Sequence, residues 1–436
     1  MADKAQRVRG TQDIIGEEAA RFEAVVAAFD RVRKLYGFRS VQVPMFEFTE
    51  VFARSIGETT DVVSKEMYSF DDRGGESITL RPEFTAGIAR AYLSNGWQQH
   101  APLKVATWGA AFRYERPQKG RYRQFHQLDA EVLGAAEPAA DVEIIAFAHQ
   151  LLGELGLGDK VALQLNTVGD VETRGAWRDA LVGYFGKVRS ELSTESQERL
   201  DKNPLRILDS KDDRDRAFVV DAPKIDTYLT AEARGFFDKV CAGLDASGVA
   251  YERTATLVRG LDYYRHTAFE FVTTHLGAQG TVIGGGRYDG LIEALGGAHT
   301  PAVGWAGGIE RLAMLIEAPA EETMELAVIP RDEAAEPIAL ETLSLLRKGG
   351  IAAEIAYSGS EKRRFEKAKK AGTARLINVD VDLGADVLAS LTIRDLNVRA
   401  DQDMVRKRIV DSLGYGFELD HDLRGSRLIF LTGRKA

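Results

Sequence analysis

The sequence has a single cysteine, Cys241, among 436 residues. One thiol cannot form an internal disulfide framework or a multi-thiolate metal site. The sequence also lacks a run of roughly 18 apolar residues, an apolar signal core near its start, an HExxH pair and a GxxxxGK[ST] loop. We therefore expect a cytoplasmic protein that has no membrane segment and no metal site of its own, and that does not bind ATP through a P-loop.

An excess of positive charge is also absent. Lys and Arg number 57 against 66 Asp and Glu, which gives a formal net charge of −9. A negative field repels phosphate at long range, so an RNA partner must bind at local basic patches. The remaining composition is ordinary for a soluble protein, with 44% hydrophobic and 28% charged residues, and the length allows two or three domains.

One stretch rich in charge is FRYERPQKGRYRQFHQLDAE, residues 112–131. Alternating side chains predict two strands, 112–115 and 124–131, and Pro117 and Gly120 interrupt the pattern between them. A solvated basic hairpin is the plain interpretation. However, Phe125 among arginines suits the stacking of a base, and the Pro-Lys-Gly loop suits a flap that covers an anionic substrate.

This stretch resembles motif 2 of class II aminoacyl-tRNA synthetases, and RYERPQKGRYRQFHQ is similar to the version in histidyl-tRNA synthetases. Residues 259–264, RGLDYY, lie between expected strands 254–258 and 266–273 and resemble a motif distinctive of that family and its close paralogues. A buried ion pair between Arg259 and Asp262 is the plain alternative.

Two further segments resemble the other motifs of class II synthetases. A predicted helix 17–36 and strand 39–43, which ends at Pro44, resemble motif 1, the element that forms a dimer. A small-residue strand 302–308 followed by a helix 309–316 resembles motif 3, whose glycines would let adenine lie against the backbone. The glycines of residues 284–286 predict either a hairpin bend or a close approach of the backbone to another group.

Glu83 and Thr85 lie where a predicted strand, 76–80, turns into a helix that extends to about residue 93. Helix capping explains these residues without any ligand. In the family, the corresponding LRPE-x-T segment resembles part of the amino-acid pocket. Phe84 departs from the small residue expected there, so it either narrows the pocket entrance or fills the core beside it.

The resemblance implies a role for each candidate residue. Arg113 and Arg259 would stabilise charge on the α-phosphate when the histidine carboxylate attacks ATP. Glu131 and Tyr264 would bind the imidazole, which presents one donor and one acceptor when neutral. The implied histidine-binding set is Glu83, Thr85, Arg113, Gln127, Glu131, Arg259, Tyr263 and Tyr264. The implied ATP-binding set is Arg113, Glu115, Arg121, Phe125 and Arg311. Arg116, Gln118 and Arg123 would contact the tRNA acceptor end, and ATP implies Mg²⁺.

The expected fold class is α+β. A class II antiparallel sheet flanked by helices would be formed by residues 1–167 and 253–320, with a helical insertion at 168–252. Alternating strands and helices from 326 to 379 predict a mostly parallel sheet in a C-terminal α/β domain, 324–436. This domain resembles the anticodon-binding domain of the family. A basic helix at 360–371 is a candidate phosphate-binding surface, although it could also be a solvated face.

The resemblance therefore implies a histidine–tRNA ligase that binds tRNA(His), histidine and ATP and forms a homodimer. The alternative is a regulatory paralogue, a subunit of ATP phosphoribosyltransferase. Such paralogues lack the anticodon domain and lose the ATP-binding arginines, whereas Arg113, Arg259 and Arg311 are all present here. A synthetase for another amino acid is disfavoured mainly by RGLDYY.

Overall fold

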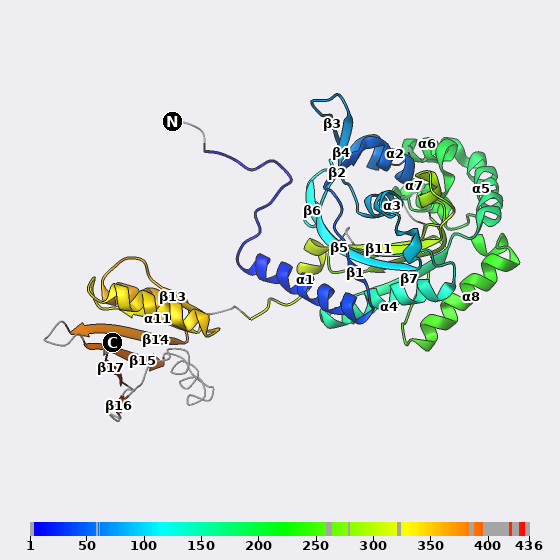
Figure 1. The fold of residues 1–436 in the computed structure, drawn as a ribbon. Helices are drawn as coiled ribbons and strands as arrows, with labels where there is room; N and C mark the ends of the chain where they lie inside the picture. Colours follow the sequence, from blue (N-terminus) through cyan, green and yellow to red (C-terminus); the bar gives the residue numbers. More distant parts are fainter. Residues whose placement is uncertain are drawn as a thin grey trace. The chain divides into compact units, whose positions relative to one another are not determined.

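The computed structural model describes residues 4–57, 60, 62–258, 264–277, 280–320, 324–382, 388–395, 418–420 and 427–431. Two of the predicted site residues, Arg259 and Tyr263, lie outside these ranges. The chain divides into two compact units, Met1–Pro319 and Ala320–Ala436. In Figure 1 the first unit runs from blue to yellow and the second from yellow to red.

A large sheet organises the described part of the first unit, with the strand order β1-β5-β6-β11-β10-β9-β7-β8. Neighbouring strands from β5 to β7 are antiparallel, and β1 and β8 add to the two edges in parallel. The bounds are β1 Arg39–Ser40, β5 Leu103–Phe112, β6 Gln124–Leu133, β7 Ala162–Thr167, β8 Glu252–Arg253, β9 Arg265–Val272, β10 Thr281–Arg287 and β11 Ala302–Gly308. This arrangement confirms the predicted antiparallel sheet.

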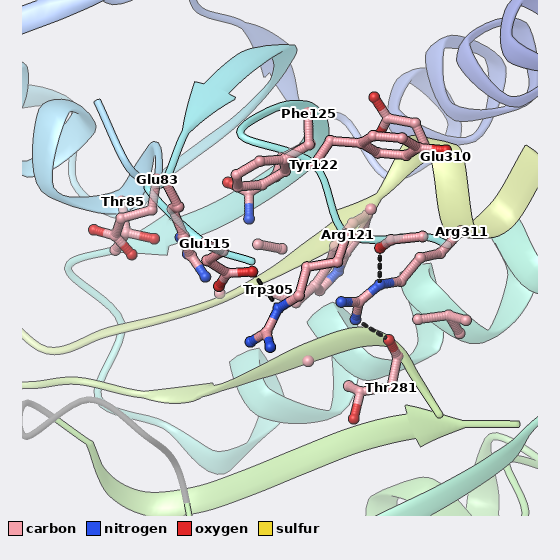
Figure 2. Close-up of a pocket in the computed structure, with 18 of the residues that line it drawn as sticks. Glu83, Thr85, Glu115, Arg121, Tyr122, Phe125, Thr281, Trp305, Glu310 and Arg311 are labelled. Carbon is pink, nitrogen blue, oxygen red and sulfur yellow. Dashed lines mark hydrogen bonds and ion pairs between the residues drawn. The ribbon is translucent and has the colours of Figure 1, made fainter. Parts of the chain in front are cut away.

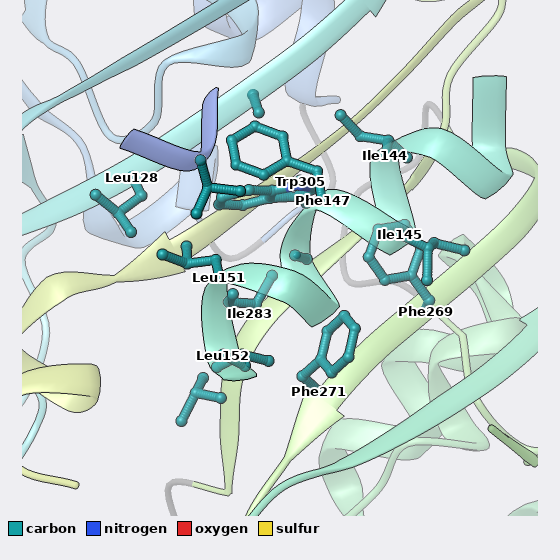
Figure 3. Close-up of a cluster of buried hydrophobic side chains, with 14 of the residues drawn as sticks. Leu128, Ile144, Ile145, Phe147, Leu151, Leu152, Phe269, Phe271, Ile283 and Trp305 are labelled. Carbon is teal, nitrogen blue, oxygen red and sulfur yellow. The ribbon is translucent and has the colours of Figure 1, made fainter. Parts of the chain in front are cut away.

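Helices cover one face of this sheet, and the main hydrophobic core lies beneath them. The helices are α1 (Glu17–Leu35), α4 (Pro138–Glu154), α8 (Ala231–Ala246) and α10 (Ile309–Ala313). Figure 1 shows α1 and α4 side by side along the sheet, and Figure 3 shows Phe147 of α4 against Trp305 of β11. Because side chains alternate along a strand, Leu128 and Ala130 of β6 face this core while Asp129 and Glu131 face the opposite side.

The opposite face carries α3 (Thr85–Ser94) and a small second sheet of β2 (Phe46–Phe48), β4 (Ser77–Leu80) and β3 (Tyr68–Asp71), next to α2 (Thr49–Ile56). The segment between β7 and β8 is helical, as predicted, and comprises α5 (Val171–Phe185), α6 (Thr194–Lys202), α7 (Asp213–Val219) and α8. Trp177, Leu181 and Phe185 of α5 are buried in a core of this segment. No described helix of the chain is long and apolar enough to cross a membrane.

Two strand predictions in this unit are wrong, and the structure decides between the two alternatives for residues 284–286. The first hairpin strand is β5, which ends at Phe112, so residues 113–115 follow the sheet instead of forming it. Residues 254–258 form a turn instead of a strand: the backbone N–H of Leu257 donates to the carbonyl of Thr254 at 2.9 Å, and the side-chain amide of Asn166 donates to the carbonyl of Leu257 at 2.8 Å. The glycines of residues 284–286 belong to β10 and do not form a bend. At Gly286 a Cβ would lie 2.7 Å from the Tyr264 ring, so glycine is needed there to admit this tyrosine.

The second unit is built on a sheet with the order β13-β12-β14-β15-β17-β16. Its elements are β12 (Leu326–Pro330), α11 (Glu336–Lys348), β13 (Ala353–Ile355), α12 (Glu361–Lys370), β14 (Arg375–Asp382), β15 (Leu388–Asp395), β16 (Glu418–Asp420) and β17 (Arg427–Leu431). Only β13, β12 and β14 are parallel, and the later strands add antiparallel. The parallel sheet predicted from the alternation of residues 326–379 is therefore confirmed for those residues, and the antiparallel strands come from the later part of the sequence, for which no strand was predicted.

Candidate active site

A cavity of about 190 Å³ lies on the polar face of the large sheet. It is lined by residues from the β4–α3 junction, the segment 113–125, β6, β10, β11 and α10. It brings together every described residue predicted to bind histidine or ATP: Glu83, Thr85, Arg113, Glu115, Arg121, Phe125, Gln127, Glu131, Tyr264 and Arg311. Arg116, Gln118 and Arg123 do not line the cavity.

One end of the cavity is acidic and centres on Glu131, which is 1% exposed. The hydroxyl of Thr85 donates to Glu131 Oε1 at 2.7 Å, and the hydroxyl of Tyr288 donates to Oε2. Burial raises the pKa of Glu131 to about 8, although these two hydroxyl groups oppose the shift. Glu83 lies close by, and its Oε1 accepts the backbone N–H of Ala86 at the start of α3.

Two features of this end were not predicted from the sequence. Tyr288 had no assigned role, because its contact with Glu131 depends on how β10 places the residue that follows it. Gly304 of β11 pairs with Glu131 across the sheet, and a Cβ on Gly304 would overlap the Glu131 carboxylate. Phe84 is fully buried and its ring lies 4.0 Å from the Arg81 guanidinium, so of the two expectations for Phe84 the structure supports core packing.

The other end of the cavity is basic. Figure 2 shows Arg121 and Arg311 on the side away from Glu83 and Thr85, with Glu115 between. Arg121 forms an ion pair with Glu115, and Arg311 donates to the carbonyls of Gly120 at 3.1 Å and Thr281 at 2.7 Å. Burial and then the charge of Arg121 lower the pKa of Arg311. An anion bound here would relieve the repulsion between these cations.

The segment between β5 and β6 is held from two sides. Arg113 donates to the carbonyl of Pro82 at 3.0 Å, and its guanidinium lies 5.4 Å from the Phe125 ring centroid. The backbone N–H of Arg123 donates to the carbonyl of Gly10 at 2.8 Å, and its guanidinium lies 4.0 Å from the Tyr114 ring. Arg116 and Gln118 are exposed. Arg123 thus supports the loop, whereas Arg116 and Gln118 are accessible.

Among the described residues, no group of three or more His, Cys, Asp or Glu could hold a metal ion. Glu115 lines the basic end of the cavity and is paired with Arg121.

Comparison with known proteins agrees with this geometry. The family model described as histidyl-tRNA synthetase matches residues 10–173 and 206–312. A histidine–tRNA ligase from Novosphingobium aromaticivorans is 64% identical over 376 residues, which is 85% of this chain and 90% of that protein. One from Gluconacetobacter diazotrophicus is 54% identical over 396 residues, 91% of this chain and 95% of that protein.

Solved structures show the same likeness. The apo histidyl-tRNA synthetase of S. aureus has a TM-score of 0.74 at 32% identity and covers 90% of this chain and 95% of its own. A structure titled as an ATP phosphoribosyltransferase regulatory subunit/histidyl-tRNA synthetase from Bacillus halodurans C covers 86% of this chain and 97% of its own, with a TM-score of 0.62. At 21% identity, the latter shows only the fold. With the family model matching more than half of its length, the chain belongs to the histidyl-tRNA synthetase family of class II aminoacyl-tRNA synthetases.

Proposed function

We propose that the chain is a histidine–tRNA ligase that converts histidine and ATP to histidyl-adenylate and pyrophosphate, then transfers histidine to the 3′ end of tRNA(His). The main support is that one cavity has carboxylates at one end and guanidinium groups at the other. Carboxylates can bind an imidazole N–H and an ammonium group, and guanidinium groups can bind a carboxylate and phosphates. The substrates of the first reaction carry these groups.

The acidic end would select histidine. Glu131 would accept the imidazole N–H, and Tyr264 would bind the other ring nitrogen, with Tyr263 in support. Thr85 orients Glu131 through its hydrogen bond, and Glu83 and Gln127 would bind the ammonium group. The Oε1 atom of Gln127 is buried and has no hydrogen-bond partner among the described residues, so it is available for this contact. A site that binds a polar side chain in this way can reject analogues that lack it by about 10⁴.

The basic end would hold ATP. Arg113 would bridge the histidine carboxylate and the α-phosphate, Arg121 and Arg311 would bind the outer phosphates, and Phe125 would stack on adenine. Arg259 would approach the α-phosphate from the opposite side, an assignment that rests on the family motif alone. Each guanidinium stabilises the charge that develops on the phosphate during attack. Mg²⁺ would bind the ATP phosphates and neutralise part of their charge, with Glu115 the carboxylate within reach.

The tRNA would contact residues outside the cavity. Arg116 and Gln118 are exposed beside it and could meet the acceptor end, while Arg123 would act by holding their loop. The C-terminal unit would bind the anticodon part of the tRNA through exposed cations of α12, which are Lys362, Arg363, Lys367, Lys369 and Lys370. Arg364 is excluded from this surface because it is 7% exposed and donates to Glu336 at 2.6 Å.

A homodimer is the expected assembly. One face of the small sheet carries large aromatic side chains, with Phe46, Phe48 and Phe70 between 49% and 55% exposed. The strand register places Phe48 and Phe70 on either side of Ile78, so they form a continuous apolar face. An apolar face of this kind suits burial against a second copy. The cytoplasm, where tRNA is charged for translation, is the proposed location.

The proposed function is tested by ATP–pyrophosphate exchange with each amino acid in turn, followed by aminoacylation of tRNA(His). We expect exchange with histidine alone. The regulatory paralogue, the other candidate, would give no exchange with any amino acid. It is not favoured, because the arginines of the basic end are retained and the curated relatives reported above are ligases.

A further inference from the structure

Asp129 lies beneath the acidic end of the cavity and makes none of the substrate contacts proposed for its neighbours. It precedes Glu131 by two residues on β6, so the two side chains point to the same face of the sheet. Asp129 is 0% exposed and does not line the cavity. The chain therefore places a second carboxyl group directly behind the carboxylate that is proposed to bind the imidazole.

Neither carboxyl oxygen of Asp129 accepts a hydrogen bond from a described residue. Thr107 faces it across β5 and Ala306 faces it across β11, and the Thr107 hydroxyl is also buried without a described partner. A buried carboxylate without hydrogen bonds is strongly destabilised, whereas the protonated form loses far less on burial. The surroundings therefore favour a carboxylic acid at this position.

The charged and titratable groups around Asp129 also favour its protonated form. Glu131 and Glu83 are acidic, Tyr288 is a neutral phenol, and the basic group is Arg81. Arg81 donates from Nε to the carbonyl of Ala110 and from Nη1 to that of Val43, both at 2.8 Å. Burial, followed by the charges of Glu131 and Glu83, raises the pKa of Asp129 well above its usual range.

We propose that Asp129 is a positioning residue for histidine selection, held as a carboxylic acid whose proton is directed at Glu131, so that Glu131 meets the imidazole as a carboxylate. The two carboxyl groups lie within hydrogen-bonding reach, and each shifts the pKa of the other. The hydrogen bond from the Asp129 acid lowers the pKa of Glu131 and thus opposes the effect of burial. This inference rests on the proposed role of Glu131 as the acceptor of the imidazole N–H.

Two substitutions of Asp129 by residues of nearly the same shape distinguish a need for a hydrogen-bond donor at this position from a need for a negative charge. Asp129→Asn cannot ionise but can still donate to Glu131, whereas Asp129→Leu has neither property. We expect D129L to raise the KM for histidine about tenfold or more at pH 7, because Glu131 loses a donor to its charged form. The KM should recover as the pH is raised to 9. In D129N the KM for histidine and its pH profile should return to near the wild-type values, and the KM for ATP should change in neither variant.

Two kinetic outcomes overturn the proposal. If D129L behaves like D129N, no donor is needed at this position. If D129N is as impaired as D129L, the negative charge of Asp129 is needed, as in a pair with Arg81. Glu131→Gln distinguishes a failure of the role proposed for Glu131 from a failure of the role proposed for Asp129. An unchanged histidine KM in E131Q contradicts the proposed role of Glu131, while a raised KM in E131Q with a normal D129L contradicts only the inference.

A calorimetric measurement covers the case in which D129L does not fold. Histidine binding to the full-length wild type and to D129N is measured at pH 7.5 in phosphate and in Tris, whose ionisation enthalpies differ. If Asp129 keeps its proton throughout, both proteins exchange the same number of protons on binding. A difference of about half a proton or more means that Asp129 titrates when histidine binds, and it overturns the proposal.

Discussion

Gly304 and Glu131 are paired across β11 and β6, and the Glu131 carboxylate fills the space that a side chain on Gly304 would need. The family resemblance assigns the glycines of this strand to the adenine. At Gly304 the neighbouring group is instead a carboxylate of the histidine end. The position of the Glu131 carboxylate, which accepts from two hydroxyl groups, thus requires that residue 304 on the neighbouring strand has no Cβ.

Gly304→Ala should displace Glu131 and raise the KM for histidine about 100-fold or more, because the two hydroxyl hydrogen bonds and the imidazole contact are lost together. Steady-state pyrophosphate exchange measures this change. The matched control is Gly183→Ala in α5, where a Cβ would meet no atom within 4 Å. A normal histidine KM in G304A would show that the site tolerates a shifted carboxylate.

Tyr288→Phe should make histidine binding more dependent on pH. In the wild type we expect the affinity to rise toward about pH 8, where Glu131 loses its proton, because the charged carboxylate accepts the imidazole N–H more strongly than the protonated carboxyl group does. The Tyr288 hydroxyl lowers the pKa of Glu131, so its removal raises that pKa and moves the rise to higher pH. At pH 7 the KM should increase about tenfold.

The control for this variant is Tyr184→Phe, which removes a hydroxyl that binds the carbonyl of Phe218 at 3.0 Å within the helical segment. Y184F should lower the melting temperature and leave the pH profile of the histidine KM unchanged. A Y288F profile that overlays the wild-type profile from pH 6 to 9 would contradict the role of Tyr288.

Arg311→Lys should impair ATP binding more than histidine binding. Arg311 donates to the carbonyls of Gly120 and Thr281 from two nitrogens of its planar guanidinium, whereas lysine keeps the charge on a single flexible ammonium group, so the ATP end loses a fixed guanidinium. We expect the KM for ATP to rise about tenfold or more and the KM for histidine to stay within about twofold. Arg331→Lys, at an exposed arginine of the second unit, is the control. Equal changes in both constants would show that Arg311 acts on the whole cavity.

Substituting Asp for both Phe48 and Phe70 should produce a monomer, since two charges would be buried in the apolar contact between copies. Sedimentation velocity over a range of protein concentrations measures the assembly. Leu340→Asp is the control, because Leu340 is 55% exposed on α11, in the second unit. If the double variant sediments as the wild type does, the two copies associate through another surface.

In α12 the cations should divide into two functional groups. Replacing Arg363 and Lys367 by Ala should weaken tRNA binding and reduce the slope of log affinity against log salt by up to about one unit per lost phosphate contact. Arg364→Ala should leave that slope unchanged and lower the melting temperature, because Arg364 holds Glu336 and the carbonyl of Gly359. Lys348→Ala on α11 is the control. A reduced slope in R364A alone would reverse this assignment.

The sequence was most informative where local pattern and family motif coincide. The strand of residues 302–308 was predicted with the bounds of β11, and the first helix differs from α1 by one residue. All described residues assigned to histidine or ATP line one cavity. These successes have a physical reason, since motif residues lie on regular strands whose alternation fixes the face to which each side chain points.

The failures involve contacts between segments far apart in the chain. Residues 254–258 have the composition of a strand, but Asn166 captures the carbonyl of Leu257. Arg364 belongs to the basic helix predicted as a phosphate-binding surface, but it is buried against Glu336, which lies on another helix. Tyr288 and Asp129 gain their significance from Glu131, and no local pattern encodes that proximity.

The hydrogen bond between the Gly10 carbonyl and the Arg123 N–H has a practical consequence for experiments on this protein. Gly10 adopts a φ of +88°, and a Cβ there would lie 2.7 Å from the Arg123 side chain, so the residues before α1 fit tightly against the loop. Substitutions at Gly10, or truncations that remove it, would therefore disturb the loop next to the nucleotide end of the cavity. A label meant to leave the kinetics undisturbed belongs elsewhere, for instance on the exposed face of α11.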